Sequence, residues 1–222
     1  MLPPAIPELT ITTGGAFPVG RIFCVGRNYA AHAREMSASD REPPFFFIKP
    51  ASCLLAAPGD LLYPPRTADL HHEVELVIAI RSGGANIAPG DANSHIFGYG
   101  CGLDMTRRDL QAEAKDKRRP WDMAKSFDGA AVCAALTPAS DVTAVEHAEI
   151  SLDVNAVARQ HGLIAEMIWS VHDIVTELST YLALASGDLI YTGTPAGVGA
   201  VQRGDRLTAR ITGLAPLDIT IR

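Results

Sequence analysis

Residues 71–80 have the sequence His71-His72-Glu73-Val74-Glu75-Leu76-Val77-Ile78-Ala79-Ile80. After Glu75 the run is apolar and rich in β-branched side chains, which predicts a buried strand. Side chains alternate along a strand, so Glu73 and Glu75 point to the same face. Two carboxylates this close in a protein interior favour a cation between them, because otherwise one of them must take up a proton. The alternative is that both acids lie at a solvent-exposed strand end and bind nothing.

A third acid ends the next strand-like run. Residues 97–104 are mostly apolar or glycine and finish at Asp104, directly before a predicted helix. If the two strand ends are neighbours, Glu73, Glu75 and Asp104 converge on one point. Three carboxylates would fill half of an octahedron around a hard divalent ion and leave positions open for substrate and water. The sequence therefore predicts a site for Mg²⁺, Mn²⁺ or Ca²⁺.

A helix is predicted immediately after this acid. Thr106 and Asp109 have the spacing of a capping box, and the helix they open extends into the basic run at 115–119. Arg108 and Gln111 share one face of this helix, so both could reach a ligand held by the carboxylates. The basic run itself is interpreted as the solvated end of the helix.

A candidate general base lies closer to the N-terminus. A helix is predicted over residues 29–36, and His32 and Glu35 are three residues apart on one of its faces. A carboxylate beside an imidazole fixes its tautomer and raises its basicity, as a general base requires. The alternative is a surface ion pair. The polar loop at 37–44 could cover a site.

Further side chains could hold an anion. Lys49 ends the apolar run at 45–50, and Lys125 lies among aromatic neighbours, where loss of water strengthens its attraction to an anion. The segment 192–199 has three glycines that let backbone N–H groups approach an anion, and Thr194 adds a hydroxyl. The alternatives are a lysine that extends to water and a plain tight turn.

Composition limits the protein classes that fit. The chain has 222 residues, is 47% hydrophobic and carries a formal net charge of −6. It can bury one sizeable core, which predicts a single domain over 21–222. Residues 1–20 hold four prolines and only one strand-like piece, at 10–12, which predicts an N-terminal arm. The acidic balance argues against nucleic acid and membrane partners, and neither a transmembrane run nor a signal-peptide pattern is found. Wide spacing predicts buried, reduced thiols in a cytoplasmic protein for Cys24, Cys53, Cys101 and Cys133.

Strand-like runs outnumber helical ones, which predicts a β-rich α+β fold with a few peripheral helices. Besides the runs named above, strands are expected at 21–26, 149–157, 189–192, 206–212 and 217–221. A turn is expected at 160–162, and a helix over 171–185 with a capping box formed by Ser170 and Asp173.

Six segments carry a family resemblance: Gly26-Arg27-Asn28-Tyr29 with His32 and Glu35, Phe47-Ile48-Lys49-Pro50, His72-Glu73-Val74-Glu75, Asp104-Met105-Thr106 with Arg108 and Gln111, Lys125-Ser126-Phe127, and Thr192-Gly193-Thr194-Pro195. In this order, over nearly the whole chain, they resemble the fumarylacetoacetate hydrolase family. The resemblance implies a mixed β-roll or sandwich fold, usually a homodimer, with Mg²⁺ or Mn²⁺ held by Glu73, Glu75 and Asp104.

The resemblance also implies an activity. Short members of the family hydrolyse a C–C bond of 3-acylpyruvates, and residues 104–122 are most similar to members that split fumarylpyruvate into fumarate and pyruvate during aromatic (gentisate) degradation. By this resemblance His32, oriented by Glu35, removes a proton from water, while Lys125 holds the pyruvoyl end or the developing negative charge. Side chains implied to complete the site for the small anionic keto acid are Arg27, Lys49, Arg108, Gln111 and Thr194.

Other functions fit the same residues. The site could hydrolyse acetylpyruvate, or it could decarboxylate oxaloacetate, because the two reactions differ mainly in whether water is activated. A non-catalytic, metal-dependent binder of keto acids is a further alternative. The presence of His32, Glu35 and Lys125 argues against that last function.

Overall fold

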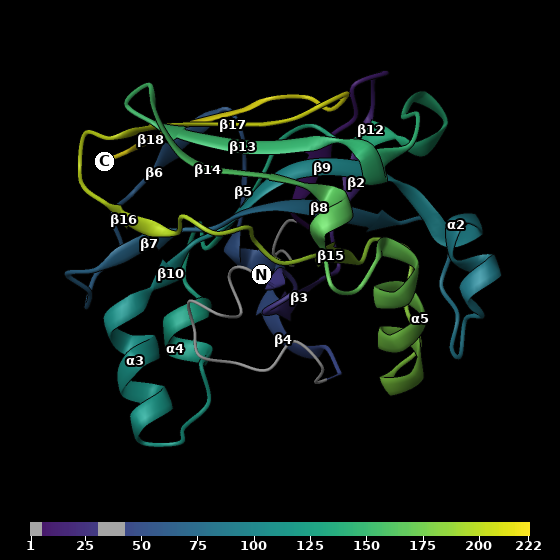
Figure 1. Cartoon of the computed structure of the whole chain (residues 1–222), viewed down its shortest axis with the longest axis horizontal. Helices are drawn as coiled ribbons and strands as arrows, with labels where there is room; N and C mark the ends of the chain where they lie inside the picture. The colour runs from purple at the N-terminus through teal and green to yellow at the C-terminus, as the bar shows by residue number, and fades with distance from the viewer. Residues whose placement is uncertain (1–5, 31–42) are drawn as a thin grey trace, which may run out of the picture.

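The computed structural model describes residues 6–30 and 43–222. The helix expected to carry His32 and Glu35, and most of the loop expected at 37–44, lie outside the described residues. Within the described part, strands dominate and form sheets of two, three, five and eight strands (Figure 1). The expected β-rich α+β fold is confirmed. No helix in this part is long and apolar enough to cross a membrane.

The eight-stranded sheet contains the run that opened the sequence analysis. In order across the sheet its strands are β4 (Phe45–Pro50), β3 (Arg21–Gly26), β15 (Leu189–Tyr191), β8 (Val74–Ile80), β9 (Ile96–Asp104), β11 (Ala131–Cys133) and β5 (Leu54–Ala56), with β12 (Thr137–Pro138) paired to β9. All seven side chains of β8 are buried, as its apolar sequence predicted. Leu76 and Ile78 face the larger of two hydrophobic cores, and Val77 and Ala79 face the smaller one.

The five-stranded sheet lies across the top in Figure 1, above the eight-stranded sheet. Its strands in order are β14 (Val157–Leu163), β13 (Glu149–Val154), β17 (Arg206–Ile211), β18 (Leu217–Ile221) and β6 (Gly59–Leu61). Buried and exposed residues alternate along β13 and β17, so one face of this sheet packs inward. The larger core fills the space between the two sheets.

The turn expected at 160–162 is wrong, because those residues lie inside β14. The chain reverses earlier, at Asn155 and Ala156, whose φ angles of 52° and 62° are left-handed. Asn tolerates this conformation, and its side-chain oxygen also accepts a hydrogen bond from the Arg206 N–H at 3.0 Å. The apolar alternation continues through the reversal, which hides the turn in the sequence.

Two small sheets complete the β-structure: β10 (Thr106–Arg107), β7 (Leu70–His72) and β16 (Gly199–Val201) in one, and β1 (Glu8–Thr10) and β2 (Ala16–Pro18) in the other. The β1–β2 hairpin occupies part of the segment expected to be an arm. Its Leu9 and Phe17 are buried in the smaller core beside Ile22 and Tyr191. This described part of the N-terminal segment is therefore packed against the rest of the fold.

The helices lie at the lower edge and the right of Figure 1. They are α2 (Ala92–His95), α3 (Arg108–Asp116), α4 (Asp122–Lys125) and α5 (Val171–Tyr181), with 3₁₀ turns at Ala51–Cys53, Pro89–Asp91, Ala139–Asp141, Val145–His147 and Ile164–Glu166. The capping box predicted at Thr106 is wrong: Thr106 lies in β10, and its hydroxyl donates to the Asp104 carbonyl at 3.2 Å. Asp109 instead accepts hydrogen bonds from Thr67 and Ala68.

Helix α5 begins as predicted, with Ser170 and Asp173 forming the capping box. It ends at Tyr181, four residues before the expected end. The reason is a tertiary contact: the Leu184 N–H donates to the Gly84 carbonyl at 2.8 Å, and the Gly84 N–H donates back at 3.1 Å. This extended pairing removes the last expected turn from the helix.

Candidate metal and substrate site

Three connections between the eight-stranded and three-stranded sheets lie beside the candidate site. The β7–β8 connection consists of Glu73 alone, and the β9–β10 connection follows Asp104 directly. The third, from β15 to β16, contains Gly193 and Thr194. We call this place the sheet junction. Here two sheets fix the backbone of residues that are far apart in the sequence.

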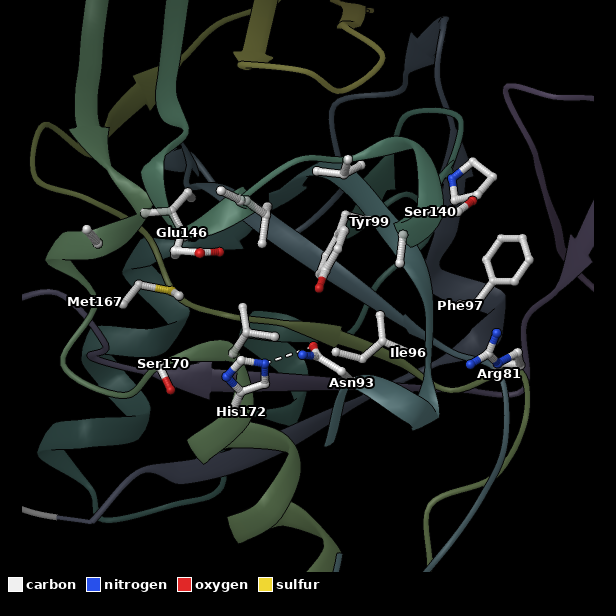
Figure 2. Close-up of a pocket in the computed structure, with 18 residues that line it drawn as sticks. Arg81, Asn93, Ile96, Phe97, Tyr99, Ser140, Glu146, Met167, Ser170 and His172 are labelled. Atoms are coloured by element: carbon white, nitrogen blue, oxygen red, sulfur yellow. Dashed lines mark hydrogen bonds between the residues drawn. The ribbon is translucent and has the colours of Figure 1, made fainter. Parts of the chain in front are cut away.

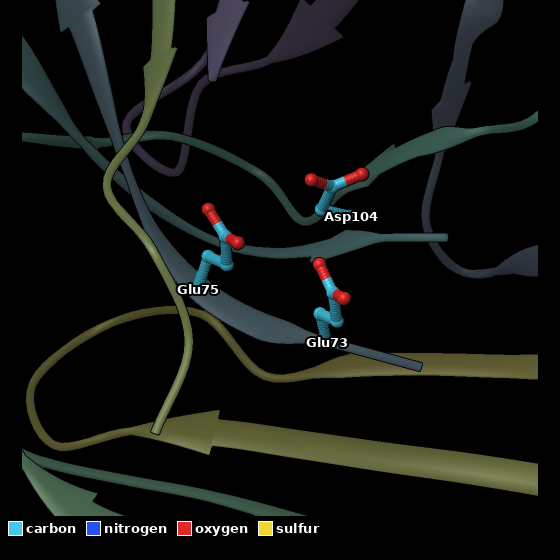
Figure 3. Close-up of side chains that lie close together, drawn as sticks. All are labelled: Glu73, Glu75 and Asp104. Atoms are coloured by element: carbon cyan, nitrogen blue, oxygen red, sulfur yellow. The ribbon is translucent and has the colours of Figure 1, made fainter. Parts of the chain in front are cut away.

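The three acids converge at the sheet junction, as Figure 3 shows. One carboxylate oxygen from each of Glu73, Glu75 and Asp104 lies within 4.8 Å of the others, and the residues are 5%, 2% and 1% exposed. The alternative of a solvent-exposed strand end is therefore excluded. The structure brings together the acids that the sequence placed on two different strands.

Three cationic side chains surround these acids. Lys125 Nζ is 2.7 Å from Glu73 Oε2 and 2.8 Å from Asp104 Oδ2. Arg108 contacts Glu73 through Nη2. Lys49 Nζ is 2.8 Å from Asp104 Oδ1, a contact that has the distance of an ion pair but not the alignment of a hydrogen bond. These cations offset much of the cost of burying the acids.

Glu75 is left with less compensation than the other two acids. Within the described residues it contacts no cation, and its carboxylate accepts one hydrogen bond, from the Gly193 N–H at 2.8 Å. Burial raises the pKa of Glu75 well above its ordinary value, and the negative charges of Asp104 and Glu73 raise it further. A cation beside Glu75 would remove this penalty.

The donor set fits a hard divalent ion. Neighbouring ligand oxygens around Mg²⁺ lie about 3 Å apart, because each is about 2.1 Å from the ion. The three acids each offer one oxygen within 4.8 Å of the others, and carboxylate oxygens are the ligand type that Mg²⁺ and Mn²⁺ prefer. Such an ion would compete with Lys125 for Glu73 and Asp104.

Lys125 is held as a positive charge. Burial alone would lower its pKa, but attraction to Asp104 and Glu73 outweighs burial and raises the pKa of Lys125. Its ammonium also lies 5.1 Å from the ring centroid of Phe47, an aromatic residue from a distant part of the sequence. Lys125 therefore supplies a fixed charge rather than a mobile proton near neutral pH.

The other sequence-predicted residues occupy different depths. Lys49 is fully buried behind Asp104 and donates to backbone carbonyls, including Ala130 at 3.0 Å. Gln111 is buried and accepts a hydrogen bond from Arg108 Nη1 at 2.6 Å. Arg27, Arg108, Gln111 and Thr194 all line the same cavity as the three acids, whereas Lys49 does not.

The glycine-rich segment serves the acids directly. Gly193 has a φ of 97° and a side chain there would meet Asn28, so only glycine lets this N–H approach Glu75. Gly197 packs against β14, where an added Cβ would lie 2.1 Å from the Arg159 carbonyl oxygen. The segment is thus more than a tight turn, although its Gly193 N–H is already used by the protein.

Sequence reasoning missed Gln160. This buried side chain of β14 accepts hydrogen bonds from His72 Nδ1 at 2.8 Å and the Val74 N–H at 3.1 Å. It donates to Thr194 Oγ1 at 2.8 Å and the Pro195 carbonyl at 2.9 Å. It therefore links both sides of Glu73 to the Thr194 segment. A polar residue on the inward side of an alternating strand was the available signal.

Lys115 was also missed. The sequence placed it in a solvated basic run, but it is half-buried and lines the cavity of the acids, while residues 116–119 are exposed. Its position seven residues after Arg108 was the signal, since residues at that spacing share a helix face.

The four cysteines are buried and reduced, as predicted. Burial raises the pKa of the Cys101 thiol to about 12. Cys101 is therefore not a reactive thiolate near neutral pH.

A larger cavity of about 1020 Å³ lies elsewhere, between β9 and the start of α5 (Figure 2). Its lining includes Arg81, Tyr99, Met167 and His172, and His172 Nε2 is 2.8 Å from Asn93 Oδ1. It has no cluster of three metal-ligating side chains among the described residues. Size alone therefore does not identify the reactive site.

The family match and the similar proteins agree. The family Fumarylacetoacetate (FAA) hydrolase C-terminal matches residues 21–222. A fumarylpyruvate hydrolase from Ralstonia sp. is 44% identical over 180 residues, which are 81% of this chain and 93% of that protein. A mitochondrial oxaloacetate tautomerase from Arabidopsis thaliana is 39% identical over 201 residues, 90% of each chain.

Solved structures extend this comparison. The crystal structure of fumarylpyruvate hydrolase from Pseudomonas aeruginosa in complex with Mn²⁺ and pyruvate superposes with a TM-score of 0.97 at 47% identity. The match covers 100% of this chain and 97% of that one. With the order of its motifs, its sheet arrangement and its three converging acids, this chain belongs to the fumarylacetoacetate hydrolase family.

Proposed function

We propose that this protein is a metal-dependent hydrolase that cleaves a C–C bond in a 3-acylpyruvate, specifically fumarylpyruvate to fumarate and pyruvate. The observation that carries the proposal is the convergence of three buried acids with Arg108 and Lys125 in one cavity. The Mn²⁺ and pyruvate in the similar Pseudomonas aeruginosa enzyme support both the ion and the keto-acid product.

Glu73, Glu75 and Asp104 would hold Mg²⁺ or Mn²⁺. When bound, the ion supplies Lewis-acid chemistry toward the oxygens of the keto acid. The protein's contribution is to hold the three acids close together where little water competes for the ion.

The charge of the cavity suits an anionic substrate. Among the described residues, four cationic side chains and three carboxylates line it, which gives this part of the lining a formal charge of one positive before a divalent ion adds two. The chain as a whole carries −6, so this part of the lining is more positive than the protein on average. Lys125 would hold the pyruvoyl carboxylate or the negative charge that develops on an oxygen of the substrate. Arg108, Gln111 and Thr194 would orient the carbon chain of the substrate.

His32 and Glu35 are the proposed water-activating pair, a prediction from sequence that the described residues do not test. His32 would take a proton from water, whose oxygen adds to the acyl carbonyl carbon. The bond from that carbon to C3 of the pyruvoyl unit breaks, C3 keeps the electron pair, and C3 then takes a proton. The products are fumarate and pyruvate, with one water consumed.

A substitution tests the pair. We expect His32→Ala to lower kcat by about 10² or more, because the general base is lost. Mn²⁺ binding, measured by titration, should stay near wild type, since His32 is not among the three acids. Near-normal turnover of the variant would remove His32 from the mechanism.

A turnover assay decides between the open functions. Purified protein with Mg²⁺ or Mn²⁺ would be given fumarylpyruvate, acetylpyruvate and oxaloacetate, and pyruvate release would be followed. We expect the highest kcat/KM with fumarylpyruvate. Metal-dependent binding of all three without turnover would instead identify a keto-acid binder.

Oxaloacetate chemistry is the second candidate, and the similarity to the Arabidopsis thaliana oxaloacetate tautomerase favours it. Oxaloacetate is also a small 2-keto acid, and its decarboxylation needs no attacking water. If His32→Ala abolishes acylpyruvate cleavage but leaves oxaloacetate decarboxylation, both activities belong to this site.

We further propose that the protein is a homodimer in the cytoplasm and that its substrate arises in aromatic-compound breakdown. These points rest on the family resemblance. Sedimentation equilibrium tests the dimer, because a monomer would give half the expected mass.

A further inference from the structure

The acid-lined cavity contains two cations, Arg27 and Lys115, that the proposed chemistry does not use. Arg108, Gln111 and Lys115 lie on one face of α3 and all line this cavity. Arg108 contacts Glu73, next to the metal-binding acids. Lys115 is seven residues farther along the helix, which places it about 10 Å away at a rise of about 1.5 Å per residue.

Lys115 and Arg27 have no anionic partner among the described residues. Lys115 Nζ lies 5.2 Å from the ring centroid of Trp121, and Arg27 Cζ lies 5.6 Å from that of Phe45. The Arg27 Nε is buried and has no hydrogen-bond partner. Two neighbouring cations that lack an anion form a suitable binding place for a carboxylate.

The electrostatics of Lys115 are consistent with a missing anion. Burial, together with repulsion from Arg108 and Arg27, lowers the pKa of Lys115 to about 8. Lys115 is still mostly protonated near neutral pH. An anion beside it would offset the repulsion.

An aromatic wall of three rings, Phe45, Phe47 and Trp121, lies beside these cations. Trp121 packs edge-on against Phe45 and Phe47, with ring centroids 5.4 Å and 6.0 Å apart. Lys125 lies over Phe47, and Arg27 lies over Phe45. This wall suits an unsaturated, uncharged carbon chain with an anionic group at each end.

The length of such a molecule can be set beside the rise of about 10 Å from Arg108 to Lys115 along α3. The seven-carbon chain of fumarylpyruvate spans roughly 7 to 8 Å when extended, given carbon–carbon bonds of about 1.5 Å. With its keto-acid end at the three acids, its far carboxylate would reach the level of Lys115. Acetylpyruvate ends in a methyl group and has nothing to place there.

We propose that Arg27 and Lys115 form a subsite for the distal carboxylate of a dicarboxylic acylpyruvate, and thereby set the preference of the site for dicarboxylic over monocarboxylic acyl chains. The proposal rests on the proposed function, because the keto-acid end must lie at the three acids.

Lys115→Met tests the subsite, with Lys117→Met as the matched control. Lys117 is the exposed C-cap residue of the same helix, and its ammonium pairs with Glu113 at 2.6 Å. We expect Lys115→Met to lower the ratio of kcat/KM for fumarylpyruvate over acetylpyruvate by about ten- to a hundredfold, the range for one charge-assisted hydrogen bond. Lys115→Arg should restore most of the ratio, and Lys117→Met should leave it within about twofold.

Product inhibition provides a second readout. Fumarate keeps the distal carboxylate and pyruvate does not, so Lys115→Met should raise the inhibition constant of fumarate much more than that of pyruvate. An unchanged substrate ratio, or equal changes for both products, would overturn the subsite while leaving the proposed function intact.

The two failures can be told apart. If the wild-type protein cleaves no acylpyruvate, the proposed function fails, and calorimetric titration of the Mn²⁺-loaded protein with fumarate tests the subsite alone. Fumarate binding that is weakened in Lys115→Met but not in Lys117→Met would support the subsite. No fumarate binding, or equal binding by both variants, would refute it.

Discussion

Glu75 faces two other carboxylates and, among the described residues, accepts one hydrogen bond, from the Gly193 N–H. Burial raises its pKa well above the ordinary value of 4.5, so the folded protein binds this proton more tightly than the unfolded chain does. Stability without metal therefore falls as pH rises above that ordinary value. Because the buried carboxylate lowers the stability of the metal-free protein, Glu75 is expected to serve binding rather than folding.

We expect Glu75→Gln to separate these two effects. At about pH 8 the metal-free variant should melt at or above the wild-type temperature, because the buried carboxylate is gone. Mn²⁺ should raise the melting temperature of the wild type and have little effect on the variant. Differential scanning calorimetry with and without Mn²⁺ measures both.

The exposed carboxylate of Glu113 supplies the control for that experiment. Glu113→Gln should keep the full Mn²⁺-induced shift, since Glu113 lies on the solvent side of α3. A shift of wild-type size in Glu75→Gln would exclude Glu75 as a ligand.

Lys115 predicts a pH dependence with a definite sign. Its pKa is lowered to about 8 by burial and by the cations Arg108, Arg27 and Lys125, with Glu73 opposing them. Above that pH the amine is neutral and cannot pair with a carboxylate. We therefore expect kcat/KM for fumarylpyruvate to fall relative to acetylpyruvate as pH rises through about 8.

The variant Lys115→Arg checks the assignment, because a guanidinium stays charged throughout that range. Its decline should move to higher pH. Identical pH profiles for wild type and Lys115→Arg would mean that another group titrates.

At the scale of elements, Gln160 connects three segments that the sequence leaves unrelated. Its strand, β14, is at the edge of the five-stranded sheet, while its partners are His72 at the end of β7, Val74 at the start of β8 and the Thr194 segment. The Gln160 side chain uses both its acceptor and its donor capacity in a buried environment. It is therefore suited to hold Glu73 and Thr194 in a fixed relation.

We expect Gln160→Leu to lower the free energy of unfolding by about 1–3 kcal/mol, because buried groups lose their partners. Mn²⁺ affinity should fall by about ten- to a hundredfold, as is typical when support of a ligand is removed. Chemical denaturation and Mn²⁺ titration measure the two quantities. Gln202→Leu, at an exposed position, is the control, and unchanged Mn²⁺ affinity in Gln160→Leu would contradict the supporting role.

Local sequence predicted those elements whose signals are themselves local. The apolar run of β8, the acid that ends β9 and the Ser170 cap of α5 were all recognisable. Thr106 and the end of α5 were misjudged because pairing with distant strands decided their conformation. Non-local pairing overrides local propensity, and a single sequence does not contain the partner.

The candidate site also has a part that local sequence predicts and a part that it does not. Residue type and spacing identified Glu73, Glu75 and Asp104, since carboxylates on buried strands are unusual. The contacts of Lys125 with two of these acids, and the links made by Gln160, depend on how the sheets meet. No periodicity along one segment encodes that arrangement.

Considered as a whole molecule, the protein has two hydrophobic cores, and the N-terminal hairpin belongs to the smaller one. Leu9 and Phe17 are buried, and the Phe17 ring lies 5.1 Å from that of Phe97. The Leu136 N–H also donates to the Thr10 carbonyl at 2.8 Å. The prolines of this segment predicted an arm, and in its described part the alternate apolar residues Leu9 and Phe17 pack inward.

We expect Leu9→Ala and Phe17→Ala each to lower the free energy of unfolding by about 2–5 kcal/mol, through lost burial and the cavity left behind. Ile6→Ala should change it by less than about 0.5 kcal/mol, because Ile6 is 65% exposed. Urea denaturation compares the three variants. Equal stability of all three would mean that the hairpin contributes little to the core.

The sheet junction affects how such an enzyme can diverge. Its acids stand on backbone that two sheets hold at once, whereas Arg108, Gln111 and Lys115 project from one short helix. Replacements along that helix can change which acyl group is accepted without displacing the acids. Related enzymes could thus acquire new substrates while retaining the same reaction. We expect the residues that differ between enzymes of different acyl selectivity to lie mainly on α3.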